Sequence, residues 1–386
     1  MKNRTNHFSN RLSINWIKKF AIFSLIIFIT SCNSCSDDNN NEPDPDPDPI
    51  PPQETLHVVG KDLFLANGEK IILRGINYPT IDAGRIDNEV QVKLQIDEAA
   101  KTGANAIRFP WYTNGKHFWD GNAGAPGTVD GWVANGSLTN MLQYTHQKGM
   151  IPILELHDPG YITCTNNWDY FNTTVSNWWK SDNVRAVIAQ TQGYLIINIA
   201  NEFGHVRFTN DQNALNTFKT NYMQLILALR SLGINVPIMI DAPDCGTSSS
   251  ELLSIAEEMQ NSDPAKNLIF STHAYWYGYA PTQAEIDQKL DEASSKNICF
   301  VIGEVANTQD VNGCGSQDIL DIAKHVLEKA CTNKIGWLAW TFDQDCSGPR
   351  EMTPDGNFNN LTPWGELVVN NPQYGLKSVA GCGAGQ

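Results

Sequence analysis

The sequence is short of positive charge. Lysine and arginine together number 27, against 42 aspartate and glutamate residues, so the formal net charge is −15. A chain this acidic is a poor candidate for binding nucleic acid or an anionic membrane surface. No nucleic-acid partner is therefore expected, whereas a neutral ligand is compatible with this balance.

Several catalytic and metal-binding motifs are also missing. There is no pair of Cys-x-x-Cys motifs and no His-x-His or His-x-x-x-His spacing, which argues against a zinc site. The Gly-x-Ser-x-Gly elbow of α/β-hydrolase esterases is absent, and "RGINYPT" is not a Gly-rich nucleotide loop. No cofactor and no catalytic metal are expected. A structural calcium site in the acidic stretch Asp343–Asp345 is an open alternative, but no motif supports it.

The first 31 residues are typical of an export signal. Five Lys or Arg residues precede the apolar run "AIFSLIIFIT" (21–30), which is too short to span a bilayer. The following "ITSC" resembles the bacterial lipoprotein signal, and an ordinary signal peptide with a chance cysteine is the alternative. We expect residues 1–31 to be removed and Cys32 to carry a lipid. The protein would then be anchored in the outer membrane or at the cell surface of a Gram-negative bacterium, facing either the periplasm or the outside.

Residues 32–55 predict a spacer. Asp-Pro repeats and a run of Asn cannot build an apolar core, and proline removes backbone donors. Such a segment is extended and semi-rigid. Residues 56–386 remain as the folded part, and loss of residues 1–31 with their five positive charges would bring the net charge to −20.

Cysteine use also bears on export. Seven cysteines follow Cys35, and in an oxidising compartment some of them are expected to pair. Cys299 lies in the apolar run "ICFVIG", which predicts a buried free thiol. Connectivity is open, and the pairing candidates are those in predicted loops: Cys164, Cys245, Cys314 and Cys346.

Beyond residue 70 the chain alternates apolar runs with helical patterns. The runs are continuous, which is typical of parallel strands buried on both faces. Eight such units predict an α/β fold, a (β/α)8 TIM barrel, after a short hairpin that turns at Asn67-Gly68; an open doubly wound sheet is the alternative. A long polar loop is expected over 112–136. The predicted strands are 71–77, 104–110, 151–157, 195–202, 236–242, 267–273, 298–304 and 335–342, and the predicted helices include 89–103, 214–233, 250–260, 283–296 and 317–332.

The ends of these strands carry polar or aromatic residues. Because the carboxyl ends of barrel strands share one rim, these side chains are expected to meet there. Glu202 and Glu304 end the fourth and seventh strands, and a carboxylate pair across the mouth suits glycoside hydrolysis. A separation of about 5–5.5 Å would serve a retaining reaction and about 6.5–9.5 Å an inverting one, a choice that the sequence leaves open. The rim residues are Asn77, Arg108, His157, Asp158, Asn201, Glu202, Asp241, His273, Tyr275, Glu304 and Trp340.

These residues lie in six segments that are specific in combination: "TGANAIRFP", "ILELHD", "IINIANE", "STHAYWY", "FVIGE" and "GWLAWTF". Together with "LFLANGEKIILRGINY" before them and "LTPWGELVVNNPQYGLK" after them, they resemble glycoside hydrolase family 5, which includes cellulases and β-mannanases. The resemblance covers residues 56–376, nearly all of the folded part. It implies that residues 56–386 form a (β/α)8 catalytic domain that hydrolyses O-glycosyl bonds with retention.

The resemblance also implies a role for each matching residue. Glu202 would be the general acid/base and Glu304 the nucleophile. Arg108 would keep Glu304 ionised, because a positive neighbour favours the charged form, and the other carboxylate would then have a raised pKa. The remaining roles would be Asn201 bonding the sugar 2-hydroxyl, Tyr275 holding Glu304, His157 and His273 lining and orienting the site, Trp340 forming the sugar platform, and Asn77 and Trp276 binding substrate.

One departure from the family pattern bears on the substrate. Many members read Asn-Glu-Pro after the fourth strand, whereas this chain reads "NEFGH" (201–205) and a bacterial mannanase-like branch also lacks the proline. This resemblance favours internal cleavage of β-1,4-mannan or glucomannan, with β-1,4-glucan as the alternative substrate, and the sequence leaves open whether cleavage is internal or from chain ends. The non-enzyme alternative is a monomeric surface lipoprotein that binds glycan on an inactive barrel, but it would predict loss of a carboxylate or of its supports. A monomer is expected in either case, and further candidate sugar platforms are Trp111, Tyr112, Trp119, Trp132, Trp168 and Tyr277.

Overall fold

The computed structural model describes residues 54–80, 88–113, 128–157, 164–311, 316–343 and 345–378. The predicted leader, the lipidation site Cys32 and nearly all of the spacer lie outside these residues, as do Asp158, Trp119 and Cys314. The expectations placed on those positions stay predictions.

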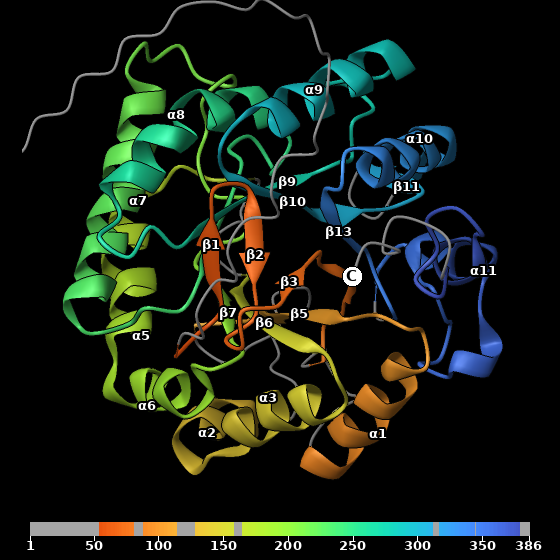
Figure 1. The fold of residues 1–386 in the computed structure, drawn as a ribbon, viewed down its shortest axis with the longest axis horizontal. Coiled ribbons are helices and arrows are strands. Elements are labelled where there is room, and N and C mark those ends of the chain that lie inside the picture. Colours follow the sequence, from red (N-terminus) through yellow and green to blue (C-terminus); the bar gives the residue numbers. More distant parts are fainter. Residues whose placement is uncertain are drawn as a thin grey trace, which may run out of the picture. The chain divides into compact units, whose positions relative to one another are not determined.

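Eight parallel strands close into a barrel, as predicted (Figure 1). Closure excludes the open doubly wound sheet. Every residue of these strands is buried, which explains why the apolar runs are continuous: the barrel interior covers one face and the helices cover the other. In barrel order the strands are β4 (Arg74–Asn77), β5 (Ala106–Trp111), β6 (Ile151–Leu156), β7 (Ile196–Asn198), β8 (Ile238–Asp241), β9 (Leu268–His273), β10 (Cys299–Val305) and β13 (Gly336–Ala339), which pairs with β4.

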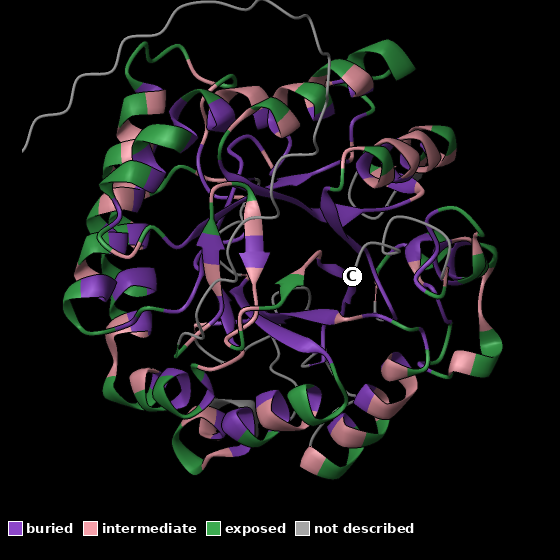
Figure 2. Cartoon of the chain, in the orientation of Figure 1, coloured by how far each residue is buried: buried purple, intermediate pink, exposed green. Residues whose placement is uncertain are grey.

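Helices surround the barrel and bury one face against it (Figure 2). In α7, for example, Phe218, Tyr222, Leu225 and Leu229 are buried and recur every three or four residues, which places them on one side of the helix. Among the described residues, no helix combines the length and the apolar character needed to cross a membrane. The helices are α1 (Glu89–Ala100), α2 (Thr128–Asn135), α3 (Ser137–Gln147), α4 (Trp168–Tyr170), α5 (Ser176–Lys180), α6 (Asp182–Thr191), α7 (Ala214–Ser231), α8 (Ser249–Ser262), α9 (Gln283–Ser295), α10 (Leu320–Thr332) and α11 (Pro363–Asn370), with a π turn at Phe171–Val175 and 3-10 turns at Gly348–Arg350 and Phe358–Asn360.

Three segments differ from the expected elements. Helix α2 occupies part of the polar loop expected over 112–136. The helix expected from residue 317 begins at Leu320, because Thr308–Asp310 (β11) and Ser316–Asp318 (β12) pair as an antiparallel hairpin. Helix α11 is absent from the expected elements, although the side chain of Thr362 caps it and a proline begins it, and both are helix-start signals.

A three-stranded antiparallel sheet lies at the amino-terminal end of the barrel. The predicted turn at Asn67-Gly68 joins its second strand to its third. Leu56, Val58 and Leu63 share an apolar cluster with the early residues of the barrel strands. Asn267, just before β9, accepts a hydrogen bond from the backbone N–H of Val58 and donates one to the carbonyl of Leu56, both at 3.0 Å. The three strands are β1 (His57–Val59), β2 (Asp62–Phe64) and β3 (Lys70–Ile71).

The cysteines of the described residues largely follow the expectation. Cys164 bonds to Cys245, and Cys346 is also in a disulfide. Cys299 is buried and free, as predicted. Cys331 is disulfide-bonded too, although it lies in helix α10 and not in a loop, where the pairing candidates were expected.

Candidate active site

Arg108 lies at the centre of the rim. It stands three residues before the end of β5, not at the end as predicted, and its side chain is fully buried. All three of its guanidinium nitrogens donate hydrogen bonds, so one side chain fixes the relative positions of groups from several strands. The acceptors are Asn198 at 2.8 Å from Nε, Asn77 at 3.0 Å and Glu304 at 2.8 Å from Nη1, and Asn201 at 2.8 Å and Asp241 at 3.3 Å from Nη2.

Glu304 lies near the end of β10 and is only 4% exposed. Its Oε1 accepts from Arg108, and its Oε2 accepts from the hydroxyl of Tyr275 at 2.7 Å. Burial raises the pKa of Glu304, and the charge of Glu202 adds to the rise, whereas His273 and Arg108 oppose it. Arg108 lowers the pKa of Glu304, but burial has the larger effect, so the net pKa lies above its ordinary value and the rise that was expected for the other carboxylate is found on Glu304.

Glu202 follows β7 by four residues and faces Glu304. Its backbone has φ of 49°, in the left-handed region that residues other than glycine rarely adopt and that is found at functional sites. Its Oε1 lies 2.7 Å from Nδ1 of His273. One oxygen of Glu202, one of Glu304 and a ring nitrogen of His273 all lie within 4.8 Å of one another. These two carboxylate oxygens are therefore closer together than the roughly 6.5–9.5 Å that separates the carboxyl groups of an inverting pair.

His273, at the end of β9, is buried among acidic groups. Its Nδ1 lies 3.5 Å from Glu304, and its Nε2 lies 3.6 Å from Asp241. Burial alone would lower the pKa of His273, but the carboxylates of Glu304 and Asp241 outweigh it and raise the pKa to about 10. Burial alone would raise the pKa of Asp241, but His273 and Arg108 hold it well below its usual range. Both groups are therefore charged at neutral pH.

A second histidine lines the rim beside Trp340. His157 directly follows β6, and its Nδ1 lies 3.2 Å from the fully buried carboxylate of Glu155. Burial lowers the pKa of His157, but the charge of Glu155, its hydrogen bond to the imidazole and the charge of Glu304 together outweigh this, so the net pKa is raised. The imidazole stacks on the indole of Trp340, with ring centroids 5.7 Å apart and planes 15° apart. His157 and Trp340 thus form one flat wall of the site.

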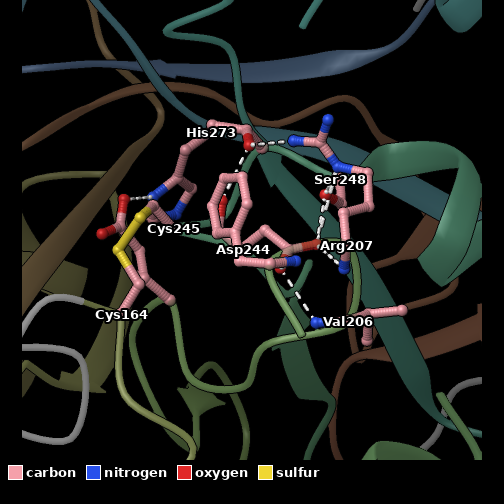
Figure 3. The surroundings of a disulfide bond; sticks show 10 residues. Cys164, Val206, Arg207, Asp244, Cys245, Ser248 and His273 are labelled. Atoms are coloured by element: carbon pink, nitrogen blue, oxygen red, sulfur yellow. Dashed lines mark hydrogen bonds and ion pairs between the residues drawn. A yellow bond between two sulfur atoms is a disulfide. The ribbon is translucent and has the colours of Figure 1, made fainter. Parts of the chain in front are cut away.

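The segment after Glu202 is held by the loop that follows β8. The carboxylate of Asp244 in that loop is fully buried and accepts the backbone N–H groups of Val206 at 2.9 Å and Arg207 at 3.0 Å. It also accepts the hydroxyl of Ser248 at 2.6 Å (Figure 3). These bonds fix the chain just beyond the carboxylate of Glu202.

The same loop is tied to two other parts of the rim. The Cys164–Cys245 disulfide joins it to the segment before α4, close to His273 (Figure 3). The carbonyl of Gly246 accepts the backbone N–H of His273 at 2.7 Å. The loop after β8 therefore positions both His273 and the segment that carries Glu202.

The aromatic candidates divide into core and rim residues. Trp276 is fully buried, so the prediction that it binds substrate is contradicted. Trp340 is 9% exposed, and its indole N–H donates to Asp345. Tyr277, after β9, is 49% exposed and available to a ligand. Trp168 is half-buried against Phe203, and the remaining described candidates are 1–2% exposed and pack in the core: Trp111, Tyr112 and Trp132.

Asn77 does not have the predicted substrate contact either. It is fully buried beneath the rim. Its Nδ2 donates to the carbonyls of Gly303 at 3.0 Å and Ala339 at 3.3 Å, while its Oδ1 accepts from Arg108. Its amide therefore positions the guanidinium from below.

Three polar residues of this network are missing from the sequence-based site. Glu155 and Asn198 each interrupt an apolar strand, "IPILEL" and "IIN", with a polar side chain. A buried polar group in such a run requires a partner, which is the signal that would have indicated them. Asp244 lies in a loop, and only the folded chain shows that backbone N–H groups surround it.

The geometry suits acid–base and nucleophilic chemistry better than metal binding. Glu202, His273 and Glu304 offer ligand-type atoms at close range. However, both oxygens of Glu304 already accept hydrogen bonds. The positive charges of His273 and Arg108 would also oppose a bound cation.

Comparison with known proteins agrees with this chemistry. The family model "Cellulase (glycosyl hydrolase family 5)" matches residues 65–345. A mannan endo-1,4-beta-mannosidase of Cellvibrio japonicus is 29% identical over 82% of this chain and 66% of that protein, so the chain spans just under two thirds of its length. A mannan endo-1,4-beta-mannosidase of Salipaludibacillus agaradhaerens is 24% identical over 81% of this chain and 90% of that protein.

Solved structures support the fold. The β-mannanase of Thermomonospora fusca in complex with mannohexaose superposes with a TM-score of 0.65, covering 86% of this chain and 98% of that one at 23% identity. At this identity the similarity establishes the barrel architecture alone. The family match, in contrast, covers most of the chain and includes the described rim from Asn77 to Trp340. The chain therefore belongs to glycosyl hydrolase family 5 and is a glycosidase.

Proposed function

We propose that the chain is a retaining endo-β-1,4-mannanase that cleaves mannan or glucomannan. The observation that supports retention is the approach of Glu202 and Glu304, with one oxygen of each within 4.8 Å. The two curated relatives described above are mannan endo-1,4-beta-mannosidases, which supports mannan as the substrate. Endo-β-1,4-glucanase activity is the second candidate, because the matching family model is named for cellulase.

The two carboxylates divide the chemistry between them. Glu304 attacks the anomeric carbon, while Glu202 donates its proton to the departing glycosidic oxygen, so that a glycosyl ester of Glu304 forms. The ester leaves Glu304 uncharged, and Glu202 then accepts a proton from water as the water attacks the same carbon. The sugar is released with its original configuration and both carboxyl groups return to their starting state.

The surrounding side chains prepare each group for its part. Arg108 and Tyr275 hold the two oxygens of Glu304 in place for attack. Because the Oδ1 of Asn201 accepts from Arg108, its Nδ2 is left to donate to the sugar 2-hydroxyl. Trp340, with His157 stacked on it, offers an apolar face to the sugar ring.

Replacement of the two carboxylates tests the roles. Glu202→Ala and Glu304→Ala should each lower kcat on mannan by at least about 10²–10⁴-fold while leaving the fold intact. Azide with an activated aryl glycoside should restore turnover to Glu304→Ala and give a product of inverted anomeric configuration. Glu258→Ala, an exposed carboxylate paired with Lys219, is the control and should keep full activity. Full activity of Glu202→Ala on mannan would contradict its assignment as the acid.

A panel of polysaccharides tests the substrate. Purified residues 56–386 should release reducing ends from mannan and glucomannan faster than from β-1,4-glucan, and early products should be mixed oligosaccharides, as internal cleavage requires. Faster release from β-1,4-glucan would favour the second candidate. No release from any β-glycan would contradict the enzyme proposal and favour the non-enzyme glycan-binding lipoprotein.

We also propose that the protein is an exported, monomeric lipoprotein anchored through Cys32. The basic leader, the short apolar run and the "ITSC" motif support the anchor. Full-length protein should incorporate labelled palmitate and fractionate with the outer membrane, whereas Cys32→Ala should do neither. Unchanged labelling of Cys32→Ala would rule out this anchor.

A further inference from the structure

A second buried arginine lies beside the candidate site and has no part in the chemistry described so far. Arg350 ends the 3-10 turn at Gly348–Arg350 and is only 6% exposed. Its Nη1 lies 3.1 Å from the carboxylate of Asp310, and its Nη2 lies 2.6 Å from the carboxylate of Asp345. Two acidic neighbours thus hold the guanidinium in one orientation.

Through Asp345, Arg350 is connected to Trp340, the proposed sugar platform. The second carboxylate oxygen of Asp345 accepts the indole N–H of Trp340. In addition, the carbonyl of Arg350 accepts the backbone N–H of Thr341, the residue after Trp340, at 3.0 Å. Arg350 therefore reaches Trp340 by two routes, one through its side chain and one through its backbone.

The guanidinium also lies near Tyr275, which contacts the nucleophile. Its central carbon lies 6.0 Å from the ring centroid of Tyr275, at the limit of a cation–π contact. The hydroxyl of Tyr275 donates to Glu304 at 2.7 Å. A change in the tilt of this ring would move that hydroxyl directly.

The contact with Asp310 adds a third attachment. Asp310 ends β11, in the β11–β12 hairpin that follows the strand bearing Glu304. The side chain of Gln309 in the same strand accepts the backbone N–H of the exposed Tyr277. Arg350 thereby holds the hairpin against the rim.

We propose that Arg350 is a positioning residue that aligns the sugar platform and the nucleophile together, Trp340 through Asp345 and Glu304 through Tyr275. This inference rests on the proposed glycan-cleaving function. It predicts that loss of the guanidinium impairs both substrate binding, through the indole, and the chemical step, through the phenol.

The test compares Arg350→Met with a matched control in the otherwise complete chain. Arg230→Met removes an equally buried arginine, 8% exposed, whose Nε and Nη2 bond Asp263 at 2.8 and 2.9 Å near the amino-terminal end of β8. Both variants should lower the melting temperature. Only Arg350→Met should also lower kcat/KM on mannan, by about 10–100-fold, since a misplacement of about 1 Å can cost on the order of 10²-fold.

Double variants separate the two routes. In a Trp340→Ala background, Arg350→Met should affect kcat alone, and in a Tyr275→Phe background it should affect mainly KM, because coupled residues are not additive. Arg350→Lys, which keeps the charge but loses the two-pronged geometry, should recover part of kcat. Equal effects of Arg350→Met and Arg230→Met on kcat and KM, or additive double variants, would overturn the inference. If instead the parent protein cleaves no β-glycan, the proposed function itself fails.

Discussion

The histidine at the end of β9 joins the acid and the nucleophile. His273 contacts Glu202 at 2.7 Å and Glu304 at 3.5 Å on one side of its ring and Asp241 at 3.6 Å on the other. Its positive charge offsets carboxylates that would otherwise repel one another inside the barrel. The arrangement of these carboxylates therefore depends on the proton of His273 even before substrate binds.

That dependence predicts how stability varies with pH. Burial opposes the proton, but Glu304 and Asp241 raise the pKa of His273 to about 10, whereas a histidine in the unfolded chain titrates near about 6.5. The folded state holds the proton more tightly, so the stabilisation is complete below about pH 6.5 and is lost as the pH rises through about 10. The melting temperature of the parent should fall over this range, and that of His273→Asn should fall less.

His325→Asn serves as the control for this measurement. His325 also faces a carboxylate, that of Asp287 at 3.0 Å, but it lies on the helical surface. Its replacement should leave the pH profile of the melting temperature parallel to that of the parent. Parallel profiles for His273→Asn as well would show that the proton on His273 does not stabilise the fold.

Among the elements, the loop after β8 packs closely against the site. Gly246 has φ of 71°, and a Cβ there would lie 2.6 Å from the ring of His273. Gly246→Ala should therefore push the imidazole away from Glu202 and lower kcat by about 10²-fold. Gly149→Ala is the matched control, because its φ is 79° with no atom within 4 Å of the added Cβ.

The two alanine variants separate strain from displacement. Both replace glycine in a left-handed conformation, so both should lose stability by about 1 kcal/mol from the backbone alone. Only the variant beside His273 should lose activity at a temperature where both are folded. An equal loss of activity in the two would indicate general destabilisation instead.

The elements also show how far the sequence can be interpreted. The barrel strands were predictable because burial on both faces leaves uninterrupted apolar runs such as "ICFVI" and "IPIL". Glu202 and Glu304 were identified as candidates because each lies within a few residues of the end of such a run. The depth of each side chain below the rim was not predictable, because it depends on where each strand lies relative to its neighbours. Asn77 and Trp276, for example, have side chains that could bind a sugar, but both are fully buried. The same limit hid Arg350, whose partners Asp310 and Asp345 come together only in the folded chain.

For the whole molecule, the excess of acidic residues has a consequence for activity assays. With 42 acidic residues against 27 basic ones, the protein repels anionic polymers, and salt screens that repulsion. KM for neutral mannan should stay within about twofold between about 50 and 500 mM salt, whereas any cleavage of carboxymethyl-cellulose should improve as salt rises. Salt-independent kinetics on both polymers would show that the overall charge has no influence at the site.

The sheet of β1, β2 and β3 also fixes where the described part of the chain begins. The carbonyl of Leu56 accepts a hydrogen bond from Asn267, just before β9. The carbonyl oxygen of Glu54 lies 3.8 Å from the position that a Cβ on Gly193, ahead of β7, would occupy. The polypeptide thus enters the fold beneath the barrel, on the side away from Glu202 and Glu304. Under the proposed anchor, a tether joined at this entry would leave the rim with Glu202 and Glu304 unobstructed at its point of attachment, so that a polymer could lie across that rim.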